Sequence, residues 1–286
     1  MRRQSRSPRQ RPEKRRACQR GFYIPHRLAA EAVAAATAGY PELVPLFRAA
    51  EPAMGAIFDE IDGMAAALLA IDRAGDPPPA PRFRQDWFPR LDAAAAYALV
   101  RTRRPATVVE IGCGHSTRWF ARAVADGGLA TRLTAIDPRP RATLAGLPMT
   151  FLRTTLQKAG TGPFAEVTSG DLLSLDGSHV LMPGTDVDIV VNRLMPELPA
   201  GVLVHLHDIF LPDPYPARWL GRGYNEQQAV APLLSGAGWR ILWSSHWAAT
   251  RMAGRLSRSV VAELPLLPGA LEASLWLESF KSPLSE

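Results

Sequence analysis

Short runs of hydrophobic residues recur along the chain between glycines, prolines and polar residues, and their spacing predicts alternating strands and helices. We expect strands near residues 106–111, 132–136, 149–155, 171–176, 201–207, 239–244 and 273–278. Helices are expected near residues 116–126, 139–145, 162–167, 184–196 and 225–236. This alternation predicts an α/β fold with a doubly wound, seven-stranded sheet.

The last predicted strand, 273–278, is expected to run against its neighbours. It follows a loop that has no room for a crossover helix after residues 258–264. A strand that lacks such a crossover enters the sheet antiparallel.

Ahead of the sheet, the apolar spacing in residues 27–38 and 41–74 predicts helices, and the proline-rich segment 76–81 predicts a stiff linker that ends them. We assign residues 23–80 to an N-terminal helical cap and residues 81–286 to the domain that contains the sheet. A helix near residues 91–101 is expected to lead into the first strand.

Basic residues are concentrated at the N-terminus. Of 33 Lys and Arg and 27 Asp and Glu in the chain, residues 1–20 hold nine basic residues and one acid, Glu13. The other 24 basic and 26 acidic residues give the rest of the chain a net charge of −2, although the whole chain carries +6. Residues 1–22 are therefore predicted to be a disordered basic tail, and the slightly acidic body disfavours a built-in groove for nucleic acid.

Composition also bears on location. The chain contains no run of 18 apolar residues, so no membrane span is predicted. An export signal would require an apolar segment after the paired arginines near the N-terminus, and none follows them. The two cysteines, Cys18 and Cys113, make no disulfide framework and suit a reducing compartment. We expect a cytoplasmic protein.

The stretch from Glu110 to Thr117 carries the clearest chemical signal. Gly112 and Gly114 follow a predicted strand and precede a predicted helix that Ser116 or Thr117 can cap, an order typical of a nucleotide-type ligand loop. A dinucleotide loop would add a third glycine, but Ser116 and Thr117 occupy that place. The Glu110 carboxylate would repel a phosphate and attract an ammonium and a sulfonium, which indicates S-adenosylmethionine.

Asp137 completes the predicted cofactor site. It stands at the end of the strand 132–136, where a carboxylate on an adjacent parallel strand can accept hydrogen bonds from ribose hydroxyls. The predicted cofactor-binding residues are Glu110, Gly112, Gly114, Ser116, Thr117 and Asp137.

The segment Glu110-x-Gly112-x-Gly114 and Asp137 resemble the first and second motifs of class I S-adenosylmethionine-dependent methyltransferases. The chain is also similar to a small-molecule branch of that class, with Ser116-Thr117, Asp-Gly-Ser-His at 176–179 and His-Asp at 207–208. The resemblance covers roughly residues 80–280. It implies a Rossmann-like sheet with an antiparallel last strand and a methyl-transferring enzyme.

Polar residues follow the fourth and fifth predicted strands as well. Asp176 and His179 follow the fourth, and His207 and Asp208 end the fifth. Because the carboxyl ends of parallel strands meet at one edge, we expect these four candidate catalytic residues beside the cofactor loop, facing the acceptor. We interpret His205, in mid-strand, as a core histidine whose ring nitrogens are hydrogen-bonded.

Two mechanisms fit this set. His179 or His207 can act as a general base that takes the proton of an acceptor hydroxyl. Alternatively, Asp176 and Asp208, alone or with a histidine, can hold a divalent cation that lowers the pKa of that hydroxyl. The resemblance makes Mg²⁺ the candidate ion, although the Asp-Gly-Ser-His and His-Asp pattern departs from that of the magnesium-dependent enzymes.

The sequence thus predicts methyl transfer to oxygen, with nitrogen as the alternative, on a small molecule or sugar-like metabolite. A proline- and aromatic-rich segment, 209–224, is read either as a wall or lid of that site or as aromatic packing. One rival function is a non-catalytic protein that binds S-adenosylmethionine, and the four acceptor-side residues argue against it. The other is an RNA-modifying methyltransferase recruited by the basic tail, which the acidic body disfavours.

Overall fold

The computed structural model describes residues 27–28, 31, 38–71, 75–236 and 238–280. Seven strands form one sheet in the order β3-β2-β1-β4-β5-β7-β6. Their bounds are Thr107–Ile111 for β1, Arg132–Ile136 for β2, Thr150–Leu152 for β3, Leu172–Leu175 for β4, Leu203–Leu206 for β5, Trp239–Ser244 for β6 and Leu275–Ser279 for β7. All seven predicted strands are present.

The sheet is parallel from β3 to β5, and β7 lies antiparallel between β5 and β6. The prediction of an antiparallel last strand is therefore confirmed. The sequence analysis missed the short helices that lie between β6 and β7, which are α11 (Ser245–Arg251), α12 (Ala253–Leu256) and the 3₁₀ turn η6 (Val260–Glu263). Each has only one or two turns, too few for a hydrophobic period to be visible in the sequence.

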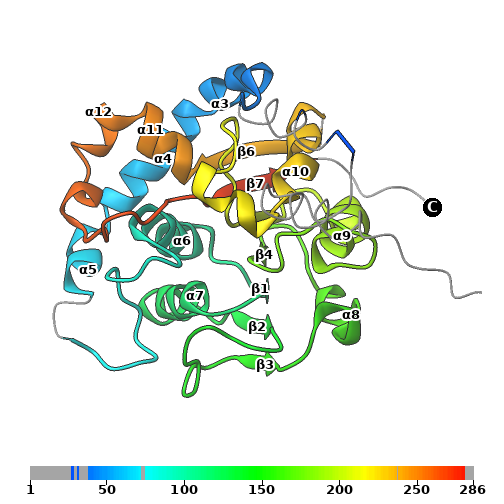
Figure 1. Ribbon diagram of the computed structural model, residues 1–286. Helices are drawn as coiled ribbons and strands as arrows, with labels where there is room; N and C mark the ends of the chain where they lie inside the picture. Colours follow the sequence, from blue (N-terminus) through cyan, green and yellow to red (C-terminus); the bar gives the residue numbers. More distant parts are fainter. Residues whose placement is uncertain (1–26, 29–30, 32–37, 72–74, 237, 281–286) are drawn as a thin grey trace, which may run out of the picture.

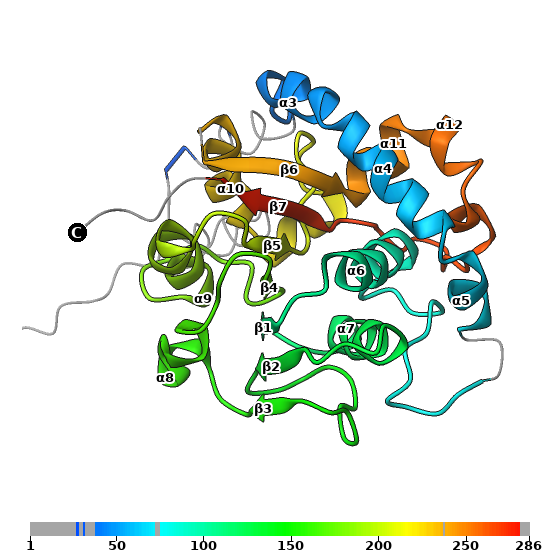
Figure 2. The same cartoon turned by 180° about the vertical axis from the view of Figure 1, so that it is seen from behind.

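Helices cover both faces of the sheet (Figures 1 and 2). On one face lie α6 (Arg90–Arg103) and α7 (His115–Asp126), which follow the predicted helices closely. On the other lie α8 (Leu156–Ala159), α9 (Asp186–Ile189) and α10 (Glu226–Ser235). After α9 the chain continues as a π-helical segment, η3 (Val190–Leu194), and a 3₁₀ turn, η4 (Met195–Glu197), so the helix predicted over 184–196 is present in pieces.

Two helix predictions need correction. No helix forms over 139–145, where the chain makes bends and turns, because Pro140 and Gly146 interrupt any helical hydrogen-bond pattern. The helix expected over 162–167 is a single 3₁₀ turn, η2 (Gly162–Phe164). Both segments connect strands on the β2–β3–β4 side of the sheet.

The N-terminal helices pack into the same hydrophobic core as the sheet. They are η1 (Pro41–Leu43), α3 (Val44–Ala49), α4 (Glu51–Asp62) and α5 (Ala65–Ala70). Phe47 stacks on Trp247 at 5.5 Å between ring centroids, and Phe58 meets Trp243 edge-on at 4.9 Å, which fixes this layer against β6 and α11. The predicted basic tail and most of the helix predicted over 27–38 lie outside the described residues.

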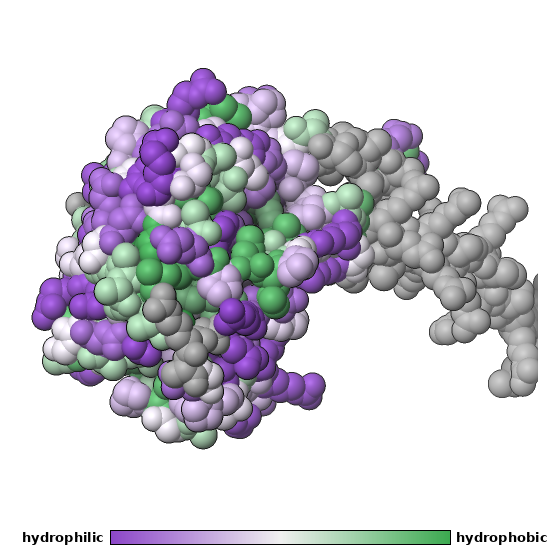
Figure 3. All heavy atoms as spheres, turned by 90° about the vertical axis from the view of Figure 1, so that its left-hand side faces the viewer, coloured by the Kyte–Doolittle hydropathy of each residue, from purple (hydrophilic) through white to green (hydrophobic). Residues whose placement is uncertain are grey.

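The exterior mixes polar and apolar side chains. Figure 3 views the side that lies at the left of Figure 1, and hydrophobic residues there are interspersed with hydrophilic ones. Among the described residues, no helix combines the length and the apolar composition needed to span a bilayer.

Candidate active site

A cavity of about 750 Å³ opens at the carboxyl ends of β1, β2, β4 and β5. Its wall includes the glycine loop after β1, Asp137 after β2 and the polar residues after β4 and β5. Open parallel sheets bind ligands at this edge, where neighbouring crossovers leave the sheet in opposite directions. All four predicted catalytic residues therefore line the same cavity as four of the predicted cofactor residues, Gly112, Gly114, Ser116 and Asp137.

The glycine loop turns sharply between β1 and α7. Gly112 has φ +73, and its N–H donates to the carbonyl of Ile136 at 3.0 Å. The Gly114 N–H donates to the Thr117 hydroxyl at 2.9 Å, which closes the first turn of α7. A Cβ on Gly114 would have its nearest protein neighbours 3.8 Å away, which is ordinary van der Waals contact, so the fold itself does not exclude a side chain at that position.

Glu110 supports this loop from below. Its carboxylate is fully buried, and it accepts hydrogen bonds from the hydroxyls of Ser116 at 2.5 Å and Thr117 at 2.6 Å. Burial, with the charges of Asp176 and Asp137, raises the pKa of Glu110 to about 8. Ser116 lines the cavity, whereas Glu110 and Thr117 lie behind the described residues that form its wall. Glu110 thus holds the loop in place, and as the protonated acid it adds no charge beneath the loop at neutral pH.

Asp137 joins the loops that follow β1 and β2. One carboxylate oxygen accepts from the Cys113 N–H at 2.9 Å, and the other accepts from the Arg139 N–H at 2.5 Å. Asp137 is only partly buried and lines the cavity, so its carboxylate remains accessible to a ligand. Burial raises the pKa of the Cys113 thiol far above its ordinary value, which keeps that residue an unreactive part of the loop.

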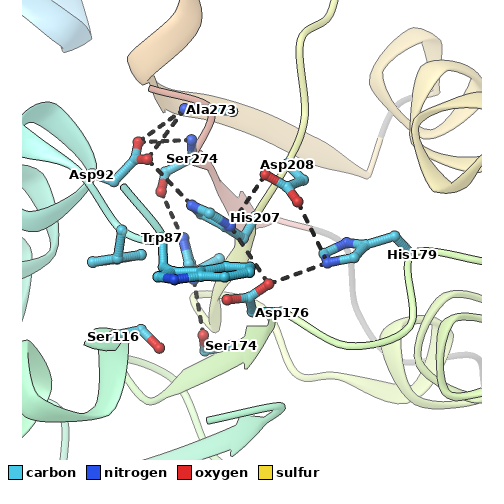
Figure 4. A network of polar contacts seen from close by, with 12 residues as sticks. Trp87, Asp92, Ser116, Ser174, Asp176, His179, His207, Asp208, Ala273 and Ser274 are labelled. Atoms are coloured by element: carbon cyan, nitrogen blue, oxygen red, sulfur yellow. Dashed lines mark hydrogen bonds and ion pairs between the residues drawn. The ribbon is translucent and has the colours of Figure 1, made fainter. Parts of the chain in front are cut away.

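Four side chains after β4 and β5 form a compact group, which we call the Asp/His cluster: Asp176, His179, His207 and Asp208. His179 Nε2 lies 3.3 Å from Asp176 Oδ1 and 3.5 Å from Asp208 Oδ2. His207 Nδ1 lies 3.5 Å from Asp176 Oδ1 and 3.5 Å from Asp208 Oδ1. Figure 4 shows both imidazoles directed at the two carboxylates. The sequence analysis anticipated all four residues, and the fold brings them together.

Two members of the cluster have an uncommon backbone conformation. His179 has φ +58 and Asp208 has φ +59, both in the left-handed region that non-glycine residues rarely adopt. Backbone of this kind costs free energy and is found most often at functional sites, where the surrounding structure maintains it.

Two further carboxylates, which the sequence analysis missed, bind the outer nitrogens of the histidines. Asp92, fully buried on α6, accepts from the backbone N–H groups of Ala273 and Ser274 and lies 3.2 Å from His207 Nε2. Glu226, buried at the start of α10, lies 2.5 Å from His179 Nδ1. The sequence does offer one signal for Asp92, because it is the single charged residue in the otherwise apolar, alanine-rich segment 91–98.

The charges of the cluster depend on one another. Burial alone would lower the pKa of each histidine, but for His179 the charge of Glu226, and for His207 that of Asp176, help to raise the pKa well above its ordinary value. Burial alone would raise the pKa of Asp176, yet the charges of His207 and His179 hold it well below the ordinary value. Burial raises the pKa of Asp208 despite those histidines. The buried carboxylates therefore need positive charge at the centre of the cluster.

His205 is a core residue, as predicted. Its ring nitrogens pair with the hydroxyls of Ser174 at 2.8 Å and Ser274 at 2.9 Å. Burial lowers its pKa to about 3, so the ring stays neutral.

The aromatic segment 209–224 contributes to the cavity wall. Trp219 and Arg222 line the cavity, with the Arg222 guanidinium 3.9 Å from the centroid of the Trp219 ring. The Tyr224 ring lies 4.4 Å from the His179 ring. Trp87, ahead of α6, closes the wall from another side, beneath the Arg141 guanidinium. The sequence analysis left open whether this segment forms a wall or lid of the site or only packs its aromatic rings. Trp219 and Arg222 fit the wall.

Comparison with known proteins finds a protein family that matches the part of the chain around this site. Residues 109–209 match the profile of a family described as a methyltransferase domain (Methyltransf_24). That stretch runs from β1 past β5 and contains the glycine loop, Asp137 and the Asp/His cluster. This stretch is similar to that methyltransferase domain. The predicted seven-stranded fold is confirmed, and the match supports the prediction of a class I methyltransferase.

Among curated proteins no similar sequence is found. Solved structures that are similar to the chain include the Podospora anserina methyltransferase PaMTH1 with S-adenosylhomocysteine bound (14% identity over 90% of this chain and 98% of that one, TM-score 0.41). A putative methyltransferase from Thermobifida fusca YX is 13% identical over 93% of this chain and 92% of that one, with a TM-score of 0.43. The plantazolicin methyltransferase BpumL is 12% identical over 81% of this chain and 99% of that one, with a TM-score of 0.44.

Proposed function

We propose that the protein is an S-adenosylmethionine-dependent methyltransferase that methylates an oxygen of a small molecule or sugar-like metabolite, with nitrogen as the alternative acceptor. One observation carries the proposal. A single cavity in a methyltransferase domain joins the glycine loop and Asp137 to the Asp/His cluster. Cofactor and acceptor can therefore bind next to each other, as direct transfer requires.

The residues of the loop fit the cofactor. Gly114 leaves room for a ligand to approach the backbone, and Asp137 offers a carboxylate that can accept hydrogen bonds from ribose hydroxyls. His115 lines the same wall, and its buried Nδ1 has no hydrogen-bond partner among the described residues. The negative charge of Asp137 and Asp176 suits a ligand that carries an ammonium and a sulfonium.

When bound, S-adenosylmethionine supplies an electrophilic methyl group. The protein must then orient the acceptor oxygen in line with that methyl and remove its proton as it attacks. The Asp/His cluster is the part of the cavity wall with groups able to do so. His179 or His207 can accept the proton when neutral, or the cluster can hold a divalent cation that makes the hydroxyl more acidic.

The residues are compatible with the cation. Ligand atoms of Asp176, His179 and Asp208 all lie within 4.8 Å of one another. The predicted magnesium ligands, Asp176 and Asp208, thus share a site with a histidine nitrogen. Bound there, a cation would bring positive charge to carboxylates that otherwise depend on protonated histidines.

The proposal is tested by incubating the protein with methyl-labelled S-adenosylmethionine and a metabolite extract. We expect label in a low-molecular-weight product and measurable cofactor binding by calorimetry. Asp137→Ala should lower both, and omission of the extract should remove the labelled product. Cofactor binding without labelled product from any extract would contradict the enzymatic function and favour a non-catalytic cofactor-binding protein.

A chelator arm separates the two mechanisms. If a cation activates the acceptor, chelator treatment should remove transfer, and the divalent ion should restore it. If a histidine is the base, transfer should continue unchanged in the presence of chelator.

A further inference from the structure

The two histidines of the Asp/His cluster are held in the same way from opposite sides (Figure 4). On one side, Asp92 binds His207 Nε2, which leaves Nδ1 facing Asp176 and Asp208. On the other, Glu226 binds His179 Nδ1, which leaves Nε2 facing the same two carboxylates. Each ring therefore has one nitrogen committed to an outer carboxylate and one directed at the centre.

This arrangement fixes the tautomer of each neutral ring. A carboxylate accepts the ring N–H, so the proton of a neutral imidazole lies on the outer nitrogen. The inner nitrogen then presents a lone pair toward two carboxylates. Lone pairs and carboxylates that converge on one point repel one another unless positive charge lies between them, and either a proton on each inner nitrogen or a bound metal cation can supply that charge.

We propose that the Asp/His cluster binds a divalent transition metal of the first row in preference to Mg²⁺. The metal would be held by two imidazole nitrogens and two carboxylates, with Asp92 and Glu226 orienting the rings. The role of this metal in activating the acceptor rests on the proposed function. Metal binding itself does not, because it needs neither cofactor nor acceptor.

Ligand atoms of Asp176, His179 and Asp208 all lie within 4.8 Å of one another, and His207 Nδ1 is the fourth candidate ligand because it lies 3.5 Å from one oxygen of each carboxylate. Two ligands of one tetrahedral ion, each about 2.0–2.1 Å from the metal, are about 3.3–3.4 Å apart. The inner nitrogen–oxygen distances are 3.3 Å and 3.5 Å for His179 and 3.5 Å for both contacts of His207. All four residues line the cavity, so an ion bound there is accessible to an acceptor.

The donor atoms decide between classes of ion. Mg²⁺ takes oxygen ligands and keeps several waters. Imidazole nitrogen suits later first-row ions such as Co²⁺ and Zn²⁺ better than it suits Mg²⁺. An outer carboxylate on each imidazole is the arrangement usual for metal-bound histidine. The prediction of Mg²⁺ on Asp176 and Asp208, alone or with a histidine, followed from the resemblance, and His207 with Asp92 changes that preference.

The test uses Co²⁺ as a spectroscopic probe on the full chain after chelator treatment and dialysis. We expect one equivalent to bind by calorimetry, with visible absorption bands of a nitrogen- and oxygen-ligated ion. A 100-fold excess of Mg²⁺ should not displace it, whereas Zn²⁺ should. Absence of stoichiometric Co²⁺ binding, or displacement by Mg²⁺ at comparable concentration, would overturn the proposal.

Variants separate ligands from orienting residues. His207→Ala should abolish tight Co²⁺ binding, and His207→Asp, which replaces nitrogen by oxygen, should shift the Co²⁺/Mg²⁺ affinity ratio at least 10-fold toward Mg²⁺. Asp92→Asn and Glu226→Gln should weaken Co²⁺ binding about 10- to 100-fold, as loss of an outer hydrogen bond to a ligand does. Unchanged affinity in the folded His207→Asp protein, shown by circular dichroism, would contradict the assignment.

The chain supplies a matched control. His246 also pairs with a carboxylate, Asp213, at 2.6 Å, but that pair is not part of the cluster. His246→Asn should leave Co²⁺ stoichiometry and absorption unchanged, and an equal loss there would locate the ion elsewhere. If Co²⁺ binds as expected while no labelled product forms, the metal site stands and only the methyl-transfer proposal fails.

Discussion

Gly112 lies so close to Asp176 that a Cβ on residue 112 would be 1.8 Å from the Asp176 carbonyl oxygen. The Asp176 N–H in turn donates to the carbonyl of Ile111 at 2.8 Å. The glycine loop after β1 and the first residue of the Asp/His cluster after β4 are therefore packed backbone against backbone. A change in one of them is transmitted to the other without an intermediate side chain.

Gly112→Ala should consequently destabilise the whole fold. The new Cβ clashes with the Asp176 backbone, and alanine is strained at φ +73. We expect a loss of more than about 2 kcal/mol in the free energy of unfolding, measured by urea denaturation. Wild-type stability would show that the two loops can separate at little cost.

Gly114→Ala tests ligand approach with the fold intact. Its Cβ meets no protein atom closer than 3.8 Å, so stability should change by less than about 1 kcal/mol. The methyl group instead enters the space where a ligand would approach the loop, and S-adenosylmethionine affinity should fall at least about 10-fold, or 1.4 kcal/mol. Calorimetry that finds full affinity in this variant would place the cofactor away from Gly114.

The protonation of Glu110 should make stability depend on pH. Its pKa is about 8 in the folded protein, against an ordinary value of 4.5, so between these values the folded state holds a proton that the unfolded chain has lost. The stabilisation is complete below pH 4.5 and disappears as the pH rises through 8. Within that window this one group lowers the free energy of unfolding by up to about 1.4 kcal/mol per pH unit.

Glu110→Gln isolates that effect because glutamine resembles the protonated acid. Its oxygen can accept from Thr117, and its NH₂ can donate to Ser116. Urea denaturation at pH 5 to 8 should give a free energy of unfolding that falls less steeply with pH for the variant than for the wild type. Parallel pH profiles for the two proteins would mean that Glu110 is ionised in the folded state.

Asp137 should contribute to cofactor affinity more than to stability. Asp137→Asn keeps an oxygen that can accept the Cys113 N–H but loses the charge that strengthens hydrogen bonds from ribose hydroxyls. We expect S-adenosylmethionine binding to weaken by about 1–3 kcal/mol. Thermal unfolding of the free variant serves as the control, and equal affinity in calorimetry would argue that the ribose binds elsewhere.

The sequence was most informative where local pattern and tertiary structure agree. Apolar runs between turn residues located all seven strands, and the glycines after the first run located the sharp turn between β1 and α7. The ends of parallel strands lie at one edge in any sheet of this type, so Asp176 and His207 could be placed together from topology alone.

What remained invisible depends on contacts between distant segments. Asp92 meets His207 and the residues before β7 only because α6 packs across them, and it lies 115 positions from its histidine. Glu226 reads in the sequence as an ordinary acid in the first turn of a helix. The short helices between β6 and β7 have no period long enough to detect. In each case the information lies in packing, which a single sequence does not display.

Asp208 provides the sharpest test of the proposed catalysis. Asparagine tolerates the left-handed backbone at φ +59, so Asp208→Asn should keep the loop while removing the charge that faces both histidines. Transfer of label to the extract product should fall about 10²- to 10⁴-fold if the cluster activates the acceptor. S-adenosylmethionine affinity should stay within a factor of three because Asp137 and the glycine loop are untouched. A variant that transfers label at the wild-type rate would show that the cluster is structural and that the acceptor is activated by other residues of the cavity.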